Sequence, residues 1–338
     1  MQAARLKALK ADLSLEEVDM PIPGDDEVVI EQLVTGICYR DVLTRDGYLP
    51  RVSLPITPGH EISGTIAKTG ASVQGFKKGD RVVSLIYLPC GKCEFCKSGQ
   101  ENLCPNRKTY GEDMDGGYAR FVKVNSRSLV HVPDGVGEHE ATISACVTGM
   151  LYHALKVVGN LSEGEKVLVT GAGGGVGVHA IQIAKVLGAE VIAETSSKQK
   201  VESLHRIGAD HVVMISDSWD KEVKKLTGDG VDFVLEAVGI HTFEKAMRTM
   251  NAGGMMVVVG NLVPQPVPLH LGLLILKGYT IRGSVSSTRD DITKVLDLSK
   301  RGKIKAISDG TMDLHEVNGA FARIKQKGNT GRVFLSLK

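Results

Sequence analysis

The chain has 338 residues, more than one ordinary hydrophobic core accommodates, so we expect two domains. Hydrophobic residues make up 42% and charged residues 24% of it, a globular composition that argues against a disordered, fibrous or membrane-embedded chain. The formal net charge is only +2, and the 41 basic and 39 acidic residues are spread along the chain, so no basic stripe indicates a nucleic-acid or anionic-membrane partner.

The amino-terminal stretch MQAARLKALKADLSLEEVDM alternates charged and apolar residues and lacks the continuous apolar core of a signal peptide. No stretch approaches the roughly 18 uninterrupted apolar residues that a membrane span requires. We therefore expect a cytoplasmic protein with no membrane and no nucleic-acid partner. In that reducing compartment, clustered cysteines more often bind metal than form disulfides.

The first candidate site combines TGICYRD, which contains Cys38, with PGHEISG, which contains His60 and Glu61. A thiolate, an imidazole and a carboxylate, completed by Cys146 or by water, would make a mixed zinc site that can exchange ligands. Asp41 could accept the other ring proton of His60 and orient the ring. Taken alone, a single cysteine or a single His-Glu pair is more often structural, so this site needs support from elsewhere in the chain.

The second candidate site is the stretch LPCGKCEFCKSGQENLCPN, residues 88–106, in which four cysteines lie close together. They are Cys90, Cys93, Cys96 and Cys104. Four sulfur ligands on a loop suit a tetrahedral zinc ion at about 2.3 Å per bond. Because four cysteines leave no position open for water, we expect a structural zinc; disulfides or unlinked thiols are the alternative.

From residue 161 onward the pattern changes to alternating strands and helices, beginning with KVLVTGAGGGVGVHAIQIAKVLGAEVIAET. A β-branched run leads into a glycine loop and then into an amphipathic helix, which is typical of a dinucleotide-binding βα unit. The glycines permit close approach of a pyrophosphate, and the helix amino terminus offers free N–H groups. The spacing is G-x-x-G-x-x-G rather than G-x-G-x-x-G. The expected cofactor loop consists of Gly171, Gly173, Gly174, Gly175, Val176 and Gly177.

Further strand and helix pairs follow this loop: HVVMI with SWDKEVKKLTG, VDFVLEAVG with TFEKAMRTM, and GMMVVVGN before YTIRGSV. Alternation of this kind predicts a doubly wound parallel sheet.

Together these motifs resemble the zinc-containing medium-chain dehydrogenase/reductase family, whose familiar members are alcohol dehydrogenases. The resemblance covers nearly the whole chain and implies an α/β fold. It implies a mostly-β, GroES-like catalytic domain at residues 1–145 and 286–338, with a structural-zinc lobe at 88–106, and a Rossmann nucleotide-binding domain at 146–285.

The resemblance also implies roles for single residues. The catalytic-zinc ligands would be Cys38, His60, Glu61 and Cys146, which with the four-cysteine lobe makes two zinc ions per chain. Arg332 would bind the pyrophosphate, and the backbones of Val259, Ser284 and Ser286 would hold the nicotinamide carboxamide. The edge strand YTIRGSV would be the place where two nucleotide domains pair, so we expect a homodimer or homotetramer.

The coenzyme is predicted from the end of the second strand of the nucleotide domain, where an acidic residue would bind the ribose 2′-hydroxyl of NAD. Counting back from IGAD, this position holds Thr195. Hydroxyl and ammonium groups follow it, at Ser196, Ser197, Lys198 and Lys200. These groups suit a 2′-phosphate, so we expect NADP(H) to be preferred. NAD(H) remains possible, because Glu194 is only one residue earlier.

The chain departs from the alcohol dehydrogenase pattern in two places. Many of those enzymes have a serine or threonine two residues after the ligand cysteine, where it begins a proton relay, and some have a histidine three residues further on. Here these positions are Arg40 and Leu43, and a guanidinium stays charged and cannot relay a proton. Met150 replaces a threonine that touches the nicotinamide. Arg40 could bind an anionic part of the cofactor or substrate, or pair with Asp41 or Glu61.

Two reactions remain open. The complete ligand set favours a zinc-dependent oxidoreductase that transfers hydride between NADP(H) and a small alcohol/aldehyde or ketone. The alternative is NADPH-dependent reduction of an enoyl thioester, because CYRD and CVTGM resemble the archaeal acryloyl-CoA reductase branch of the family. A nucleotide-binding protein without catalysis is a third reading, disfavoured because such relatives often lose the catalytic ligands.

Overall fold

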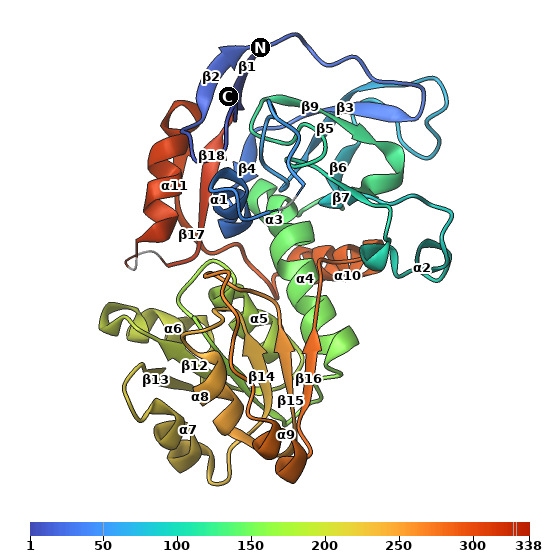
Figure 1. Cartoon of the computed structure of the whole chain (residues 1–338). Helices are drawn as coiled ribbons and strands as arrows, with labels where there is room; N and C mark the ends of the chain where they lie inside the picture. The colour runs from blue at the N-terminus through green and yellow to red at the C-terminus, as the bar shows by residue number, and fades with distance from the viewer. Residues whose placement is uncertain (50, 327, 329) are drawn as a thin grey trace. The chain divides into compact units, whose positions relative to one another are not determined.

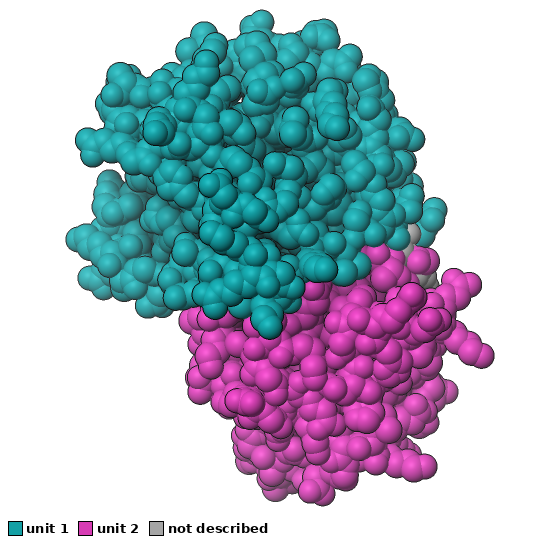
Figure 2. Space-filling view, turned by 180° about the vertical axis from the view of Figure 1, so that it is seen from behind, with its two compact units in different colours: residues 1–149, 286–326, 332–338 teal, residues 150–285, 327–331 magenta. Residues whose placement is uncertain are grey.

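A computed structural model describes residues 1–49, 51–326, 328 and 330–338 of the chain. The described residues form two compact units, which Figure 2 shows in different colours. Unit 1 comprises Met1–Gly149, Ser286–Gln326 and Arg332–Lys338, and unit 2 comprises the described residues of 150–285 and 327–331. The chain enters unit 2 after Gly149 rather than after residue 145. One helical stretch, Glu138–Val158, runs across this point, so the sequence carries no turn signal there.

Unit 1 is built mainly from antiparallel strands. These are β1 (Gln2–Arg5), β2 (Ser14–Glu17), β3 (Glu27–Glu31), β4 (Val34–Gly36), β5 (Ser63–Thr69), β6 (Arg81–Ser84), β7 (Tyr87–Leu88), β8 (Lys108–Thr109), β9 (Phe121–Asn125), β10 (Leu129–His131), β17 (Ser308–Asp313) and β18 (Arg332–Ser336). The largest sheet of this unit has the order β10-β6-β5-β3-β9. A second sheet has the order β17-β18-β4 (Figure 1). The pairs β1-β2 and β7-β8 complete the unit.

Short helices lie between these strands. They are α1 (Tyr39–Arg45), α2 (Glu94–Lys97), α3 (Glu138–Ile143), α4 (Gly149–Tyr152, at the unit boundary), α10 (Arg289–Lys300) and α11 (Val317–Lys325). A buried apolar cluster joins Val42 of α1 to Phe321 of α11 and Leu335 of β18. Burial of such side chains stabilises each by about 1.5–3 kcal/mol relative to exposure. This packing fixes α1, the helix that carries Arg40 and Asp41.

Unit 2 contains a six-stranded parallel sheet, as the alternating pattern predicted. Its strands are β11 (Lys166–Val169), β12 (Glu190–Thr195), β13 (His211–Met214), β14 (Val231–Glu236), β15 (Met250–Val258) and β16 (Thr280–Gly283). They lie in the order β13-β12-β11-β14-β15-β16, with Val167 level with Phe233 where the order reverses (Figure 1). This is the doubly wound arrangement of a Rossmann fold. The predicted fold class is confirmed.

Helices connect the strands of unit 2. They are α5 (Gly177–Val186), α6 (Val201–Ile207), α7 (Trp219–Thr227), α8 (Phe243–Arg248) and α9 (Leu271–Lys277). Trp219 of α7 and Met247 of α8 pack in one buried cluster with Val234 and Met256 of the sheet. α9 differs from the other helices, because none of its residues is buried.

The stretch Glu138–Val158 is long and apolar enough, by length and composition alone, to cross a membrane. However, 72% of its most apolar window is buried inside the protein. Burial among protein side chains is typical of a core helix, so we interpret the stretch as part of the core.

Candidate active site

A buried carboxylate, Asp41, lies at the centre of the first group of candidate residues. The backbone N–H of Cys38, where α1 begins, donates a hydrogen bond to Asp41 Oδ2 over 2.9 Å. Tyr118 donates its hydroxyl proton to the same oxygen over 2.7 Å, and His60 Nδ1 lies 3.0 Å from Asp41 Oδ1. When the ring is neutral, as a metal ligand must be, a carboxylate beside Nδ1 keeps the ring proton there and leaves the lone pair of His60 on Nε2.

The Nε2 atom of His60 meets two sulfur atoms. It lies 3.2 Å from Cys146 Sγ, which in turn lies 3.8 Å from Cys38 Sγ. One donor atom from each of Cys38, His60, Glu61 and Cys146 lies within 4.8 Å of the other three. Nitrogen and sulfur ligands of a tetrahedral zinc stand roughly 3.3–3.8 Å apart, given bonds of about 2.0–2.3 Å. The structure therefore brings together the predicted ligand set, and its donor atoms fit a zinc ion.

Cys146 reaches this cluster from an unusual backbone. Ser144–Thr148 form a π-helical turn between α3 and α4. Such turns insert an extra residue into a helix and are frequent at functional sites. No composition signal marks a π turn, so the sequence linked Cys146 to the site only as an option or through the family resemblance.

The pKa values of Cys38, His60 and Cys146 are shifted by neighbouring groups and by burial. The pKa of Cys38 is lowered well below its ordinary value, first by a hydrogen bond from Cys146 and then, against the effect of burial, by the charge of Arg332. The same hydrogen bond, together with burial, raises the pKa of Cys146. Burial alone would lower the pKa of His60, but Asp41 outweighs it and raises that pKa to about 10. A cluster with this much negative charge attracts a cation.

Glu61 has a cationic partner of its own, Arg332. The Nε atom of Arg332 lies 3.2 Å from Glu61 Oε2, and its Nη2 forms an ion pair with Oε1. Both side chains are buried, and both belong to unit 1. The structure thus places Arg332 on a candidate metal ligand, and its role at the pyrophosphate stays a prediction.

Arg40 is held by Glu112, and the suggested pairing with Asp41 or Glu61 is wrong. The Nε and Nη2 atoms of Arg40 donate to the two carboxylate oxygens of Glu112, the latter over 2.9 Å. Burial alone would lower the pKa of Arg40, but Glu112 raises it, with a smaller contribution from the charges of Cys38 and Cys146. Glu112 lies 72 residues away along the chain, so no local pattern could reveal this pair.

The four cysteines of the second site also converge. Cys93 Sγ lies 3.5 Å and Cys90 Sγ 4.0 Å from Cys96 Sγ, and all four sulfur atoms lie within 4.8 Å of one another. Backbone N–H groups of Lys92 and Cys93 lower the pKa of Cys90 to about 6, whereas burial and neighbouring thiols raise that of Cys96 to about 12. The separations match the roughly 3.8 Å expected between sulfur ligands of a tetrahedral zinc.

In unit 2 the glycine loop forms a tight turn between β11 and α5. Gly171 has a positive φ of +58°, and its carbonyl accepts a hydrogen bond from Gly174 N–H over 3.0 Å. A Cβ atom at Gly177 would lie 2.4 Å from Ala172 Cα, so only glycine fits where the helix begins. These features bring the turn and the helix amino terminus close together, as the dinucleotide-binding pattern predicted.

The residues after the second strand differ in their exposure. Thr195 is buried, and its Oγ1 accepts a hydrogen bond from Ser197 N–H, while Ser196 and Lys198 are exposed. Lys200 is buried and donates to the carbonyl of Gly173 in the glycine loop over 3.2 Å. Of the predicted coenzyme-selecting groups, the structure therefore leaves chiefly residues 196–198 open to solvent.

Glu194, one residue before Thr195, faces the protein interior. It accepts the N–H of Gly171 over 2.9 Å, and burial raises its pKa to about 7, helped by the charge of Glu236. Its carboxylate therefore supports the first glycine of the loop. No local pattern indicates this contact, because Gly171 lies in the loop after β11 and Glu194 lies in β12.

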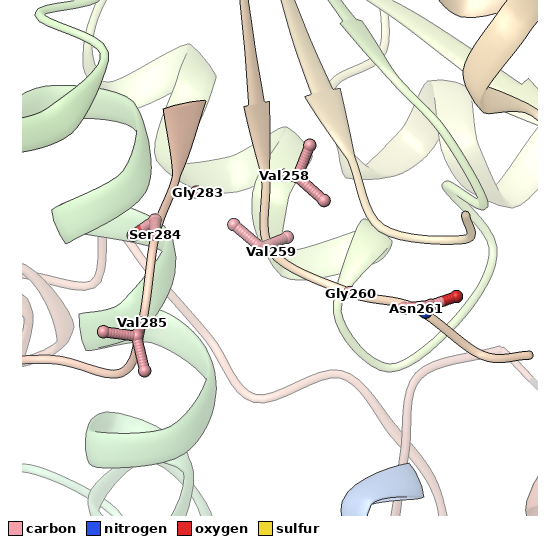
Figure 3. A pocket seen from close by; sticks show the side chains of 7 residues that line it. All are labelled: Val258, Val259, Gly260, Asn261, Gly283, Ser284 and Val285. Atoms are coloured by element: carbon pink, nitrogen blue, oxygen red, sulfur yellow. The ribbon is translucent and has the colours of Figure 1, made fainter. Parts of the chain in front are cut away.

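A pocket of about 510 Å³ lies at the carboxyl ends of β15 and β16 (Figure 3). Its lining consists of Val258, Val259, Gly260, Asn261, Gly283, Ser284 and Val285. Two predicted nicotinamide contacts, Val259 and Ser284, are thus placed in one pocket of unit 2. Ser286 belongs to unit 1, and its part in binding the carboxamide stays a prediction.

The comparisons with known proteins agree with this geometry. Residues 24–134 match the alcohol dehydrogenase GroES-like domain, and residues 175–301 match the zinc-binding dehydrogenase domain. The chain is 41% identical over 336 residues to an acryloyl-coenzyme A reductase of Sulfurisphaera tokodaii, covering 99% of each protein. The chain belongs to the zinc-containing medium-chain dehydrogenase/reductase family.

Other members of this family are also similar over their full length. An alcohol dehydrogenase of Geobacillus stearothermophilus is 34% identical, with coverage of 100% of this chain and 99% of that protein. A solved structure of an NAD-dependent alcohol dehydrogenase has a TM-score of 0.93 at 30% identity and covers 100% of both chains. This member of the family is accordingly an NAD(P)-dependent oxidoreductase that acts on a small molecule.

The two cysteine clusters should respond differently to substitution. We expect Cys93→Ser to lower the free energy of unfolding by more than about 4 kcal/mol, the range of a lost structural metal. We expect Cys38→Ser to lower kcat/KM by at least about 100-fold with the fold retained. Metal analysis, urea denaturation and steady-state kinetics check this, and an equal loss of folding in both variants would contradict the division.

Proposed function

We propose that this protein is an NADPH-dependent reductase that acts on the C=C bond of a short enoyl-CoA thioester, of the acryloyl-CoA type. One observation carries the proposal: Arg40, fixed by Glu112, stands two residues after Cys38, where alcohol dehydrogenases begin their proton relay. The full-length similarity to acryloyl-coenzyme A reductases supports it. This order reverses the preference that the ligand set alone suggested.

The reaction requires no hydroxyl relay. A hydride from NADPH adds to the β-carbon of the enoyl thioester, the C=C π electrons move toward the thioester oxygen, and a proton from solvent then joins the α-carbon. The products are the saturated thioester and NADP⁺. Because the substrate oxygen never becomes a hydroxyl group, a serine or threonine at position 40 would have no proton to move. The oxygen instead needs a group that stabilises negative charge.

Arg40 is suited to that task. Its Nε and Nη2 are occupied by Glu112, and its Nη1 makes no hydrogen bond to any residue that the structure describes. The side chain of Arg40 is 40% exposed, whereas that of Glu112 is only 8% exposed. The buried carboxylate therefore holds the guanidinium from the interior of the protein. A cation already held in place needs no reorganisation when charge develops on the substrate.

We further propose two zinc ions per chain. Cys38, His60, Glu61 and Cys146 would hold the catalytic ion, and the four cysteines of residues 88–106 would hold the structural one. When bound, the catalytic ion supplies Lewis acidity toward a substrate oxygen. The protein residues orient this site: Asp41 fixes the His60 ring, Tyr118 fixes Asp41, and Arg332 neutralises Glu61.

Carbonyl/alcohol interconversion is the second candidate, and the same ligand set favours it. Two cysteines and a histidine, with one zinc position left for exchange, are the set that zinc-dependent alcohol dehydrogenation uses. Here Arg40 would have no proton-relay role, and water would have to carry the proton.

The substrate choice is checked by NADPH oxidation with acryloyl-CoA beside a panel of small aldehydes and ketones. We expect acryloyl-CoA to give the highest kcat/KM. Arg40→Ser should lower kcat for acryloyl-CoA about 100-fold, the effect of removing one preorganised charge-stabilising donor. The control is Arg51→Ser, an exposed arginine, which should change nothing. A higher kcat/KM for any aldehyde would contradict the proposal in favour of the second candidate, and an unaffected Arg40→Ser variant would refute the role given to Arg40.

The preference for NADPH follows from residues 196–198. Ser196 and Lys198 are exposed and offer a hydroxyl and an ammonium to a 2′-phosphate, and the acid next to Thr195, Glu194, is turned inward. We expect Lys198→Glu to raise KM for NADPH about tenfold, the worth of a charged hydrogen bond, and to leave KM for NADH unchanged. Lys221→Glu, on the exposed side of α7, is the control. Equal kcat/KM for NADH and NADPH in the unaltered protein would contradict the proposal.

We propose a homodimer or homotetramer, located in the cytoplasm. β16 ends the sheet of unit 2, and α9 carries Leu271, Ile275 and Leu276, which are 62%, 76% and 86% exposed. Apolar side chains gathered beside a sheet edge mark an association surface. Light scattering should show a dimer or larger, and Ile275→Glu with Leu276→Glu should give a monomer. Leu226→Glu on α7 is the control, and a monomeric unaltered protein would refute the proposal.

A further inference from the structure

We propose that the four-cysteine lobe positions Cys146 through a bridge made by Glu101, Arg289 and Ser287. The bridge lies entirely within unit 1. The inference rests on the proposed assignment of Cys146 to the catalytic metal, but it does not depend on which substrate is reduced. It gives the lobe a part in the geometry of the active site, beyond holding its own loop together.

The bridge begins at Glu101, three residues before the ligand Cys104. Glu101 opens a short 3₁₀ turn, Glu101–Leu103, and is only 3% exposed. Its carboxylate oxygen Oε1 accepts the backbone N–H of Arg289 over 3.0 Å and lies 3.4 Å from Arg289 Nε. Arg289 is the first residue of α10, so a carboxylate of the lobe satisfies one of the free N–H groups of that helix.

A second connection joins Arg289 to the other end of the cysteine set. Arg289 Nη1 donates to the backbone carbonyl of Arg127. Arg127 Nη1 in turn donates to the carbonyl of Cys90 over 3.0 Å. The start of α10 is therefore tied both to Glu101, three residues before Cys104, and to Cys90 itself. Cys104 and Cys90 are the last and first cysteines of the lobe.

From α10 the bridge continues to the active site. Ser287 lies two residues before Arg289, and its Oγ donates to the carbonyl of Ala145 over 2.7 Å. Ala145 directly precedes Cys146 in the π-helical turn. The carbonyl of Ser287 itself accepts the hydroxyl proton of Tyr87 over 2.7 Å, and Tyr87 lies just before the lobe. Ser286, the residue before Ser287, has a positive φ of +55° that these bonds help to maintain.

The part of the lobe around α2 has no buried side chain to order it, so its order depends on the metal. α2 has no buried residue, and Gly91 and Gly99 both have positive φ values. Metal binding therefore supplies most of the order of the lobe. Once it is ordered, Glu101 is fixed in the interior and holds α10, and Ser287 holds the π-helical turn. Residues beyond the ligands commonly change metal affinity 10–100-fold when they are altered.

The test measures metal binding at the catalytic cluster without any substrate. Protein that retains one zinc per chain in the lobe, confirmed by metal analysis, is titrated with Co²⁺, and the absorption bands that Cys38→Ser abolishes are assigned to the catalytic cluster. We expect Glu101→Ala to raise the dissociation constant of Co²⁺ about tenfold and to shift these bands. Glu101→Gln, whose amide oxygen can accept the same N–H, should restore most of the affinity. Glu94→Gln, an exposed acid on the same lobe, should behave as the unaltered protein.

A second variant approaches the bridge from its other end and does not depend on the folding of Glu101→Ala. Ser287→Ala removes the bond to Ala145 and should shift the same Co²⁺ bands. Combined with Glu101→Ala, it should change the dissociation constant by less than the product of the two single changes, since both act along one path.

Three outcomes would overturn the inference. Unaltered Co²⁺ affinity and bands in Glu101→Ala or in Ser287→Ala would show that the lobe does not position Cys146. If the combined variant changed the Co²⁺ dissociation constant by the full product of the two single changes, the two contacts would be independent of each other. Failure of the unaltered protein to bind Co²⁺ at Cys38 and Cys146 would remove the metal assignment itself, a result separate from any finding about the substrate.

Discussion

The arrangement of the active site depends on the carboxylate of Asp41. It accepts hydrogen bonds from the Cys38 backbone and the Tyr118 hydroxyl and faces His60 Nδ1, so one side chain connects the start of α1, the body of unit 1 and a candidate ligand. A buried carboxylate is costly unless its oxygens are satisfied, and here both are. That requirement fixes the direction of the His60 ring, which in turn directs Nε2 toward the sulfur of Cys146.

The sequence predicted the parts of the structure that are coded locally. Alternation of strands and helices from residue 161 gave the parallel sheet, because β-branched runs and glycine turns are written in adjacent residues. The four cysteines of residues 88–106 could be grouped for the same reason, since their spacing alone brings their sulfur atoms together. His60 and Glu61 could be grouped with Cys38 only as candidate ligands, because 22 residues separate Cys38 from His60. Their meeting depends on the order of the strands in unit 1, which the sequence does not show.

The contacts that the sequence did not reveal join residues far apart in the chain. Glu112 holds Arg40 across 72 positions and Glu101 holds Arg289 across 188. No sequence pattern around Glu112 or Glu101 predicts these pairs, because a sequence does not distinguish an exposed glutamate from a buried one. α9 escaped prediction for a related reason: its apolar residues have no polar side that would mark a helix, and none of them is buried. Glu194 was placed correctly in the strand, but its contact with Gly171 depends on the register between two strands.

The charges around the four candidate ligands restrict which metal ions and substrates this site can bind. Asp41, Glu61 and the thiolate of Cys38 bring negative charge into a buried region, and burying such charge without a partner is expensive. Arg332 compensates the charge of Glu61, and Arg40 lies within electrostatic reach of both sulfur atoms, with its own charge balanced by Glu112.

A bound divalent cation would add positive charge where Arg332 now supplies it, so Glu61 would have to divide its two oxygens between the cation and Arg332. Arg40 faces no such competition, because Glu112 engages its Nε and Nη2 and leaves Nη1 without a partner among the residues described here. The positive charge of Arg40 therefore stays in place whether or not Glu61 moves. Any substrate of this site has to accommodate that charge.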